Sequence, residues 1–193
     1  YSLSTTVTDV SCHGESDGSA SILSSGCGGI SNCTYLWSNG ITSNSISNVS
    51  AGLYSVSINH PNGCLQSTDI IINEPSPLSL EAITNDALCF NGFGSVVLSI
   101  DGGNPPYIEN WFGEDFNSLP AGIYQVLVQD SLACSESITI QINEPTALQL
   151  SFLTTNDSCD VPGTVVGLPS GGTPSYVVDF LGEDPLNLNS GIY

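Results

Sequence analysis

The residues best suited to catalysis are few and do not form a set. Gly14-Glu15-Ser16-Asp17-Gly18 matches the G-x-S-x-G pattern of a nucleophile elbow, which requires a helix directly after the turn. Here the strand-like run Ser19–Leu23 follows instead, so we interpret the motif as a turn. His13 and His60 are the only histidines, and no carboxylate pair has a spacing that predicts hydrolase geometry. The sequence therefore predicts no catalytic residue and a protein that is not an enzyme.

Acidic turns are the second group that could do chemistry. Gly113-Glu114-Asp115 recurs as Gly182-Glu183-Asp184, and Asn143-Glu144 precedes a proline. Oxygen-rich loops of this kind can hold Ca²⁺, which could stiffen the chain at Asn143-Glu144. No EF-hand ligand series is present, so we expect solvated acids, no metal site and no cofactor, with Ca²⁺ as the alternative.

Charge excludes several classes of partner. The chain of 193 residues has no Lys or Arg against 19 Asp and Glu, a formal net charge of −19. Binding to nucleic acid requires cationic side chains that neutralise phosphates, and an anionic membrane surface would repel the chain. The apolar content of 40% is sufficient for packed cores, and no apolar run is long enough to insert into a membrane. We expect a soluble, exposed, extracellular chain whose targeting segment lies upstream.

Internal repeats determine the expected architecture. Asn73-Glu74-Pro75 recurs as Asn143-Glu144-Pro145. Ala51-Gly52-Leu53-Tyr54 recurs as Ala121-Gly122-Ile123-Tyr124 and as Ser190-Gly191-Ile192-Tyr193. These landmarks predict three modules: module 1 at residues 1–75 without its lead-in, module 2 at residues 76–145, and a truncated module 3 at residues 146–193.

Apolar residues alternate with polar ones inside each module, which is typical of strands. Tyr54, Val56 and Ile58 show this period, and so do the matching residues of module 2. Six or seven short strands in about 70 residues, separated by Gly- and Pro-rich turns, favour tandem Ig-like or fibronectin-III-like β-sandwiches. Trp37 and Trp111 stand on the expected third strands as core residues.

Seven cysteines predict disulfides rather than a metal or redox site, because no Cys-x-x-Cys motif is present. Cys64 and Cys134 each stand ten residues after the recurring tyrosine. Pairing within modules then gives Cys12–Cys64 and Cys89–Cys134, with six strands favoured over seven because the first and last turns must meet. Cys159 is expected to be unpaired because its partner lies beyond the end of the chain.

Cys27 and Cys33 have no counterpart in module 2, where Asp101 and Tyr107 stand instead. We expect them to bond to each other across one turn.

The ordered landmarks resemble the SprB repeat of giant cell-surface adhesins from gliding bacteria. In module 2 the resemblance rests on Cys89-Phe90-Asn91-Gly92, Gly94-Ser95, Gly102-Gly103-Asn104-Pro105-Pro106-Tyr107, Trp111, Leu119–Val126, Asp130, Cys134 and Asn143-Glu144-Pro145. Module 1 matches through Cys12-His13-Gly14, Asp17-Gly18-Ser19, Tyr35, Trp37–Gly40, Gly52-Leu53-Tyr54 and Asn62-Gly63-Cys64.

The resemblance implies type 9 secretion to the outer-membrane surface, association with the export and gliding machinery, and adhesion to an external surface or polysaccharide. Three roles remain open. The modules could form a stalk that projects an adhesive tip, or each could bind a glycan weakly and act by avidity. The chain could also be an accessory segment of an extracellular enzyme. Buried tryptophans would favour the stalk.

Overall fold

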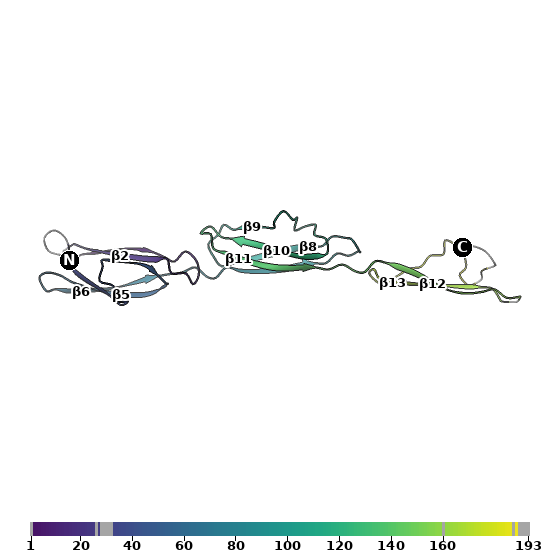
Figure 1. Ribbon diagram of the computed structural model, residues 1–193, viewed down its shortest axis with the longest axis horizontal. Coiled ribbons are helices and arrows are strands. Elements are labelled where there is room, and N and C mark those ends of the chain that lie inside the picture. Colours follow the sequence, from purple (N-terminus) through teal and green to yellow (C-terminus); the bar gives the residue numbers. More distant parts are fainter. Residues whose placement is uncertain (1, 26, 28–32, 160, 187, 189–193) are drawn as a thin grey trace. The chain divides into compact units, whose positions relative to one another are not determined.

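The regular elements are all β-strands in the part of the chain that the structure describes, which confirms the all-β prediction. The computed structural model (Figure 1) describes residues 2–25, 27, 33–159, 161–186 and 188. The turn residues 28–32 and the repeat copy Ser190–Tyr193 lie outside them. The first six strands are β1 (Leu3–Thr8), β2 (Gly18–Ser24), β3 (Thr34–Trp37), β4 (Ser45–Val49), β5 (Gly52–Asn59) and β6 (Leu65–Ile72).

Module 1 is a sandwich of two three-stranded sheets, in the orders β1-β2-β4 and β3-β5-β6. Its core is formed by the alternating side chains of both sheets. Ile22 and Ile46 come from one sheet, and Trp37, Val56 and Ile58 come from the other, and all five are buried in a single cluster. Six strands agree with the six or seven expected, and Val56 and Ile58 of the predicted period of two are buried, as is Trp37.

The strands of module 1 do not simply alternate in direction. β5 is antiparallel to both β3 and β6, and β2 is antiparallel to both β1 and β4. The end of β6 lies beside the end of β1, because Val10 N–H donates to Asn73 O at 2.9 Å. It follows that β3 and β4, which belong to different sheets, run in the same direction. The connection from β3 to β4 therefore crosses from one sheet to the other.

Similar strands recur along the rest of the chain. They are β7 (Ser79–Asn85), β8 (Ser95–Asp101), β9 (Ile108–Asn110), β10 (Gly122–Gln129), β11 (Ser135–Ile142), β12 (Gln149–Thr155) and β13 (Thr164–Ser170). The sheets are β7-β8, β9-β10-β11 and β12-β13. β5 and β10 begin at the same place in the repeat, and so do β6 and β11. The position of β4 is taken by the isolated bridge Gly94↔Leu119.

Contacts divide the chain into two compact units. The first unit comprises Tyr1–Glu81, Ser99–Asn110 and Leu127–Ser137, and the second comprises Ala82–Leu98, Trp111–Val126 and Ile138–Tyr193. The division passes through residues 76–145. It therefore does not coincide with the expected modules, whose boundaries remain a prediction from the repeat.

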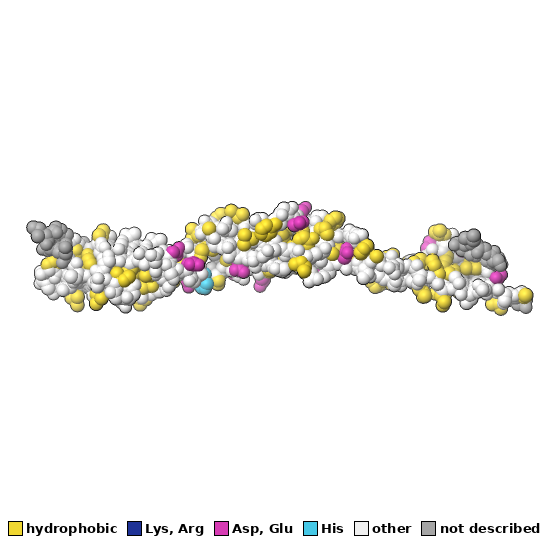
Figure 2. Space-filling view, viewed as in Figure 1, with side chains coloured by type: hydrophobic (Ala, Val, Ile, Leu, Met, Phe, Trp, Pro, Cys, Tyr) yellow, Lys and Arg dark blue, Asp and Glu magenta, His cyan; other side chains and the backbone are white. Residues whose placement is uncertain are grey.

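The surface follows the composition. Figure 2 shows acidic and hydrophobic side chains among uncharged polar ones, in a chain without Lys or Arg. Both tryptophans are buried, with exposed fractions of 1% for Trp37 and 9% for Trp111. Among the described residues, no helix is long and apolar enough to cross a membrane.

Candidate functional site at the cysteine loops

Two loops per module carry the recurring cysteines. The first loop of module 1 joins β1 to β2 and contains Cys12, and its last loop joins β5 to β6 and contains Cys64. In module 2 the first loop, between β7 and β8, contains Cys89, and the last loop, between β10 and β11, contains Cys134. The first loop of module 3, between β12 and β13, contains Cys159. These loops are the candidate functional site.

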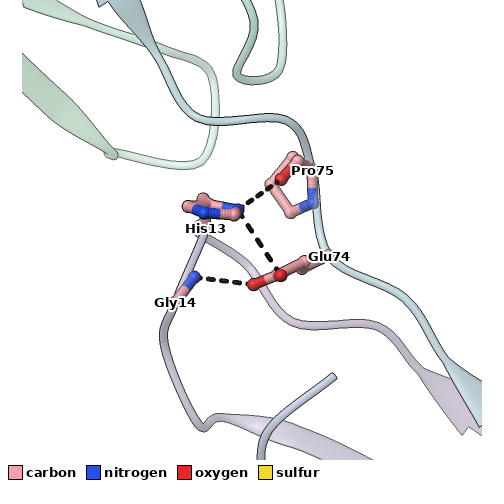
Figure 3. A network of polar contacts seen from close by, with 4 residues as sticks. All are labelled: His13, Gly14, Glu74 and Pro75. Atoms are coloured by element: carbon pink, nitrogen blue, oxygen red, sulfur yellow. Dashed lines mark hydrogen bonds and ion pairs between the residues drawn. The ribbon is translucent and has the colours of Figure 1, made fainter. Parts of the chain in front are cut away.

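The Asn-Glu-Pro motif holds the first loop of module 1. Asn73 N–H donates to Asp9 Oδ1 at 2.9 Å, and Gly14 N–H donates to Glu74 Oε2 at 2.7 Å. Figure 3 shows that His13 also points at this segment, with Nδ1 3.5 Å from Glu74 Oε1 and 3.2 Å from Pro75 O. Gly14 has φ +79°, a conformation that glycine adopts without steric cost.

The second copy of the motif makes equivalent contacts. Asn143 N–H donates to Asp86 Oδ1 at 2.9 Å, and Asn91 N–H donates to Glu144 Oε2 at 2.6 Å. Asn91 also has a positive φ of 56°. The repeated motif therefore closes the cysteine-bearing first loop by hydrogen bonds between protein groups.

The acidic turns also have local partners. Asp115 Oδ1 accepts from Asn117 N–H at 3.0 Å, and Asp184 Oδ1 accepts from Leu186 N–H at 3.0 Å. Carboxylates that bond the backbone two residues ahead form a recurrent kind of turn. Calcium binding at these acids stays a prediction from the sequence.

The catalytic candidates Ser16 and His13 contact different residues. Ser16 Oγ lies 3.0 Å from Ser50 Oγ, whereas His13 contacts Glu74 and Pro75. Gly18, the last residue of the G-x-S-x-G sequence, begins β2, so the motif is a turn before a strand, as predicted.

Neither of the two expected long disulfides forms, and a different one takes their place. Cys12 bonds to Cys134 across 122 residues of sequence, with Cα atoms 5.6 Å apart, and Cys64 and Cys89 are free and exposed. The pairings Cys12–Cys64 and Cys89–Cys134 are therefore wrong. Cys159 is free and exposed.

Strand direction explains the correction. Because β3 and β4 run in the same direction, the first and last loops of a six-stranded module lie at opposite ends of the sandwich. Asn59 pairs with Leu65 at the last loop, while Gly52 pairs with Ile72 at the other end of the same hairpin. Eight strand residues at about 3.3 Å each separate these ends by about 25 Å, far more than a disulfide can span.

Asp130 accepts hydrogen bonds from residues around the Cys12–Cys134 disulfide. Asp130, its partners and both cysteines belong to the first unit. Its Oδ1 accepts from the N–H groups of Leu132 and Cys134, both at 2.9 Å, and its Oδ2 accepts from Asn104 N–H at 2.8 Å. The side chain is 3% exposed. Burial by itself raises the pKa of Asp130, but these backbone donors lower it more, so the pKa lies below the ordinary 3.8.

Asn104 connects the Asp130 loop to the first loop of module 1. Its Nδ2 donates to Ser11 O at 3.3 Å, one residue before Cys12. On the other side of the same loop, Ser11 N–H donates to Asp17 Oδ1 at 3.0 Å. The hydrogen bonds from the side chain and backbone of Ser11 lower the pKa of Asp17. We call Ser11, Cys12, Asn104, Asp130 and Cys134 the first joint.

Cys27 and Cys33 form the expected short disulfide. His60, which is 2% exposed, places Nδ1 3.5 Å from Cys33 Sγ and Nε2 3.4 Å from Gln66 Oε1. These two cysteines and His60 are the one group with metal-ligand spacing among the described residues. The sulfurs are joined to each other, so they are not the thiolates that a metal requires.

Sequence reasoning included Asp130 and Asn104 only among the residues that carry the resemblance, and it missed their role in joining the loops. The repeat offered one signal, because Asp130 stands where module 1 has His60, and both are buried at the start of a last loop. A buried carboxylate requires several donors. The last loop supplies two of them, from Leu132 and Cys134, and the Gly-Gly-Asn turn supplies a third, from Asn104.

The arrangement defines a class of all-β repeat in which a disulfide joins residues of two neighbouring copies. Residues 4–42 match the family model described as SprB repeat. This match supports the resemblance to SprB repeats and indicates a repeat region of the kind found in cell-surface adhesins, which is not an enzyme family. No curated protein matches the chain.

Proposed function

We propose that the chain is part of the repeat region of a large extracellular adhesin, in which the modules act as a stalk that projects or contributes to an adhesive surface. The observation that carries this proposal is the joint itself. Cys12–Cys134 and the hydrogen bonds of Asn104 and Asp130 fix one module to the next through the chain's own groups. A spacer requires a joint of this kind, whereas a tethered binding domain does not.

The buried aromatic residues support the stalk over a ligand-binding array. Trp37 and Trp111 lie in cores rather than on the surface. The Tyr54 and Tyr124 hydroxyls donate to the carbonyls of Ser50 and Pro120, at 2.9 and 2.8 Å. Such a bond from a tyrosine to the backbone a few residues upstream is a structural feature of Ig-like sandwiches.

The resemblance extends the proposal to the cell. The proposal then includes export by type 9 secretion, a location at the outer membrane, contact with the gliding machinery and a role without enzymatic activity. The absence of Lys and Arg supports an extracellular life, since trypsin-like proteases find no cleavage site.

A specific observation favours a second candidate, in which modules bind surfaces directly. Phe90, Phe93 and Phe112 of module 2 are exposed by 47%, 63% and 62%. Exposed aromatic rings are suited to weak contacts with sugars or polymers. His13 and Ser38 stand at the module 1 positions of Phe90 and Phe112, so a uniform site per module is not supported.

Retention of the oxidised chain on immobilised polysaccharides, with Ca²⁺ and with chelator, tests the proposal. The chain and a tandem fusion of two chains are compared with the variant Phe90→Ser/Phe93→Ser/Phe112→Ser. For a stalk we expect no retention of any of the three. Retention that rises steeply with chain number and disappears in the triple variant would replace the stalk with the binding array.

A further inference from the structure

The first joint has a partial copy later in the chain, within the second unit. Thr173 follows Gly171-Gly172 as Asn104 follows Gly102-Gly103. Thr173 Oγ1 donates to Leu88 O at 2.8 Å, and Leu88 precedes Cys89 as Ser11 precedes Cys12. The loop after the glycine pair of one module therefore meets the residue before the first-loop cysteine of the previous module in both places.

The local structure behind this contact also recurs. Gly103 N–H donates to Ser76 O at 2.9 Å, and Gly172 N–H donates to Thr146 O at 2.6 Å. The hydroxyl of Tyr107 donates to Gly102 O, and that of Tyr176 donates to Gly171 O. A Cβ on Gly102 would overlap Pro77 O, and one on Gly171 would overlap Ala147 O. We call Leu88, Cys89, Gly172 and Thr173 the second joint.

Cys89 is accessible at the second joint. It is exposed and free, and with Thr173 and Tyr176 it lines an open cavity of about 700 Å³. At the first joint, the equivalent neighbour of Cys12 is Cys134, on the last loop of the following module. The last loop of a continued module 3 would bring its own cysteine to Cys89 in the same way.

We propose a pairing rule in which the first-loop cysteine of each module bonds to the last-loop cysteine of the next module. Cys89 is then the site for the last-loop cysteine of module 3 when that module is continued beyond Tyr193. By the same rule, Cys64 accepts the first-loop cysteine of any module placed before module 1, and Cys159 bonds to a module placed after module 3. The rule is independent of whether the modules are a stalk or bind a ligand.

The chemistry is disulfide exchange with a small-molecule disulfide. Two protein thiols form one S–S bond, and glutathione disulfide is reduced to two molecules of glutathione, which receive the two protons and two electrons. The same exchange forms the Cys12–Cys134 bond, so the second joint requires no reagent that the first does not.

The test extends the full chain after Tyr193 with a copy of its own residues Gln125–Pro145, in register with Tyr124. The protein is refolded in reduced and oxidised glutathione, and remaining thiols are alkylated. Because the chain lacks Lys and Arg, pepsin at acid pH is used for peptide mapping, which also suppresses disulfide exchange.

We expect the added cysteine to bond to Cys89, with Cys12–Cys134 and Cys27–Cys33 intact and with Cys64 and Cys159 alkylated. The extended Cys159→Ser variant should keep this pattern, and the extended Cys89→Ser variant should leave the added cysteine alkylated. A bond between the added cysteine and Cys159 would overturn the rule in favour of pairing within modules. A free added cysteine beside an intact Cys12–Cys134 bond would also overturn it.

Discussion

Asp130 is the residue on which the first joint depends most. One carboxylate accepts hydrogen bonds from three backbone N–H groups, on the Cys134 loop and on Asn104. Asparagine in its place would direct an amide N–H₂ at donors, so at least one of these groups would lose its partner. Hydrogen bonds to charged acceptors contribute about 1.5–3 kcal/mol each.

We therefore expect Asp130→Asn to lower the unfolding free energy of the oxidised chain at pH 7 by about 2 kcal/mol. Guanidinium unfolding followed by tryptophan fluorescence measures the effect. The control is Asp101→Asn, which removes the same charge from an exposed residue. Equal stability of the two variants would contradict the role given to Asp130.

The same carboxylate predicts a dependence on pH. The folded pKa of Asp130 lies below the ordinary 3.8, and so does that of Asp17. A group whose pKa is lowered by folding contributes stability above the unfolded value, and this contribution is lost as pH falls through the folded value. Stability should therefore decrease below about pH 3.8. In Asp130→Asn this decrease should be smaller, while Asp101→Asn should follow the wild type.

At the scale of elements, a glycine near the start of the second strand of each module allows close packing. A Cβ on Gly18 would lie 2.8 Å from Ile72 Cγ2, and one on Gly163 would lie 2.9 Å from Thr155 O. A Cβ on Gly94 would overlap Asn85 O and lie 2.6 Å from Ile142 Cγ2. These three glycines are required by space rather than by an unusual φ.

Gly94→Ala should destabilise the β7–β8 and β10–β11 region by about 1–3 kcal/mol, because added atoms in a packed core force the backbone to shift. Gly122→Ala is the control, since its new Cβ would meet only Tyr124 atoms at 3.4 Å or more. Amide hydrogen exchange of residues 82–98 measures the local effect. Unchanged protection in Gly94→Ala would contradict the packing described here.

Much of this level of structure could be predicted from the sequence. The period of two identified Val56, Ile58, Val126 and Val128 as core residues, and all four are buried. The disulfide pairing was missed for a topological reason. A repeat shows which residues are equivalent, but it does not show whether equivalent residues meet within a copy or between copies. Which of the two occurs depends on the relative direction of β3 and β4, and side-chain periodicity carries no information about strand direction.

The joint network was missed for a different reason. Asp130 and Asn104 are ordinary polar turn residues in the sequence, and their importance arises only when two segments distant in sequence come together. Such contacts leave no spacing pattern within either segment.

For the molecule as a whole, Cys12–Cys134 closes a loop of 122 residues. In the chain-entropy model a loop of this size stabilises the folded state by about 5 kcal/mol. Cys12→Ser should therefore lower the guanidinium midpoint and make Cys134 available to alkylation. Cys64→Ser, which removes a free exposed thiol, should leave the midpoint unchanged. Equal midpoints for the two variants would show that the bond contributes little.

The net charge of −19 predicts a response to salt. Self-repulsion of like charges destabilises compact states, and it is screened beyond about 3 Å in 1 M salt compared with about 30 Å in 0.01 M salt. The thermal midpoint should rise between these NaCl concentrations. KCl should give the same rise, whereas a midpoint independent of both salts would show that the acids are too dispersed to repel one another.

The Cys12–Cys134 bond also determines how the protein would respond to a pull along its backbone. Load applied at the two ends would cross from residue 12 to residue 134 through a single covalent bridge and bypass the intervening chain. At about 3.4 Å per residue, the 122-residue separation stores about 400 Å of contour length that cannot extend while the bridge is intact. Reduction would release this length, so the thiol–disulfide balance of the surroundings would set how far the chain can extend.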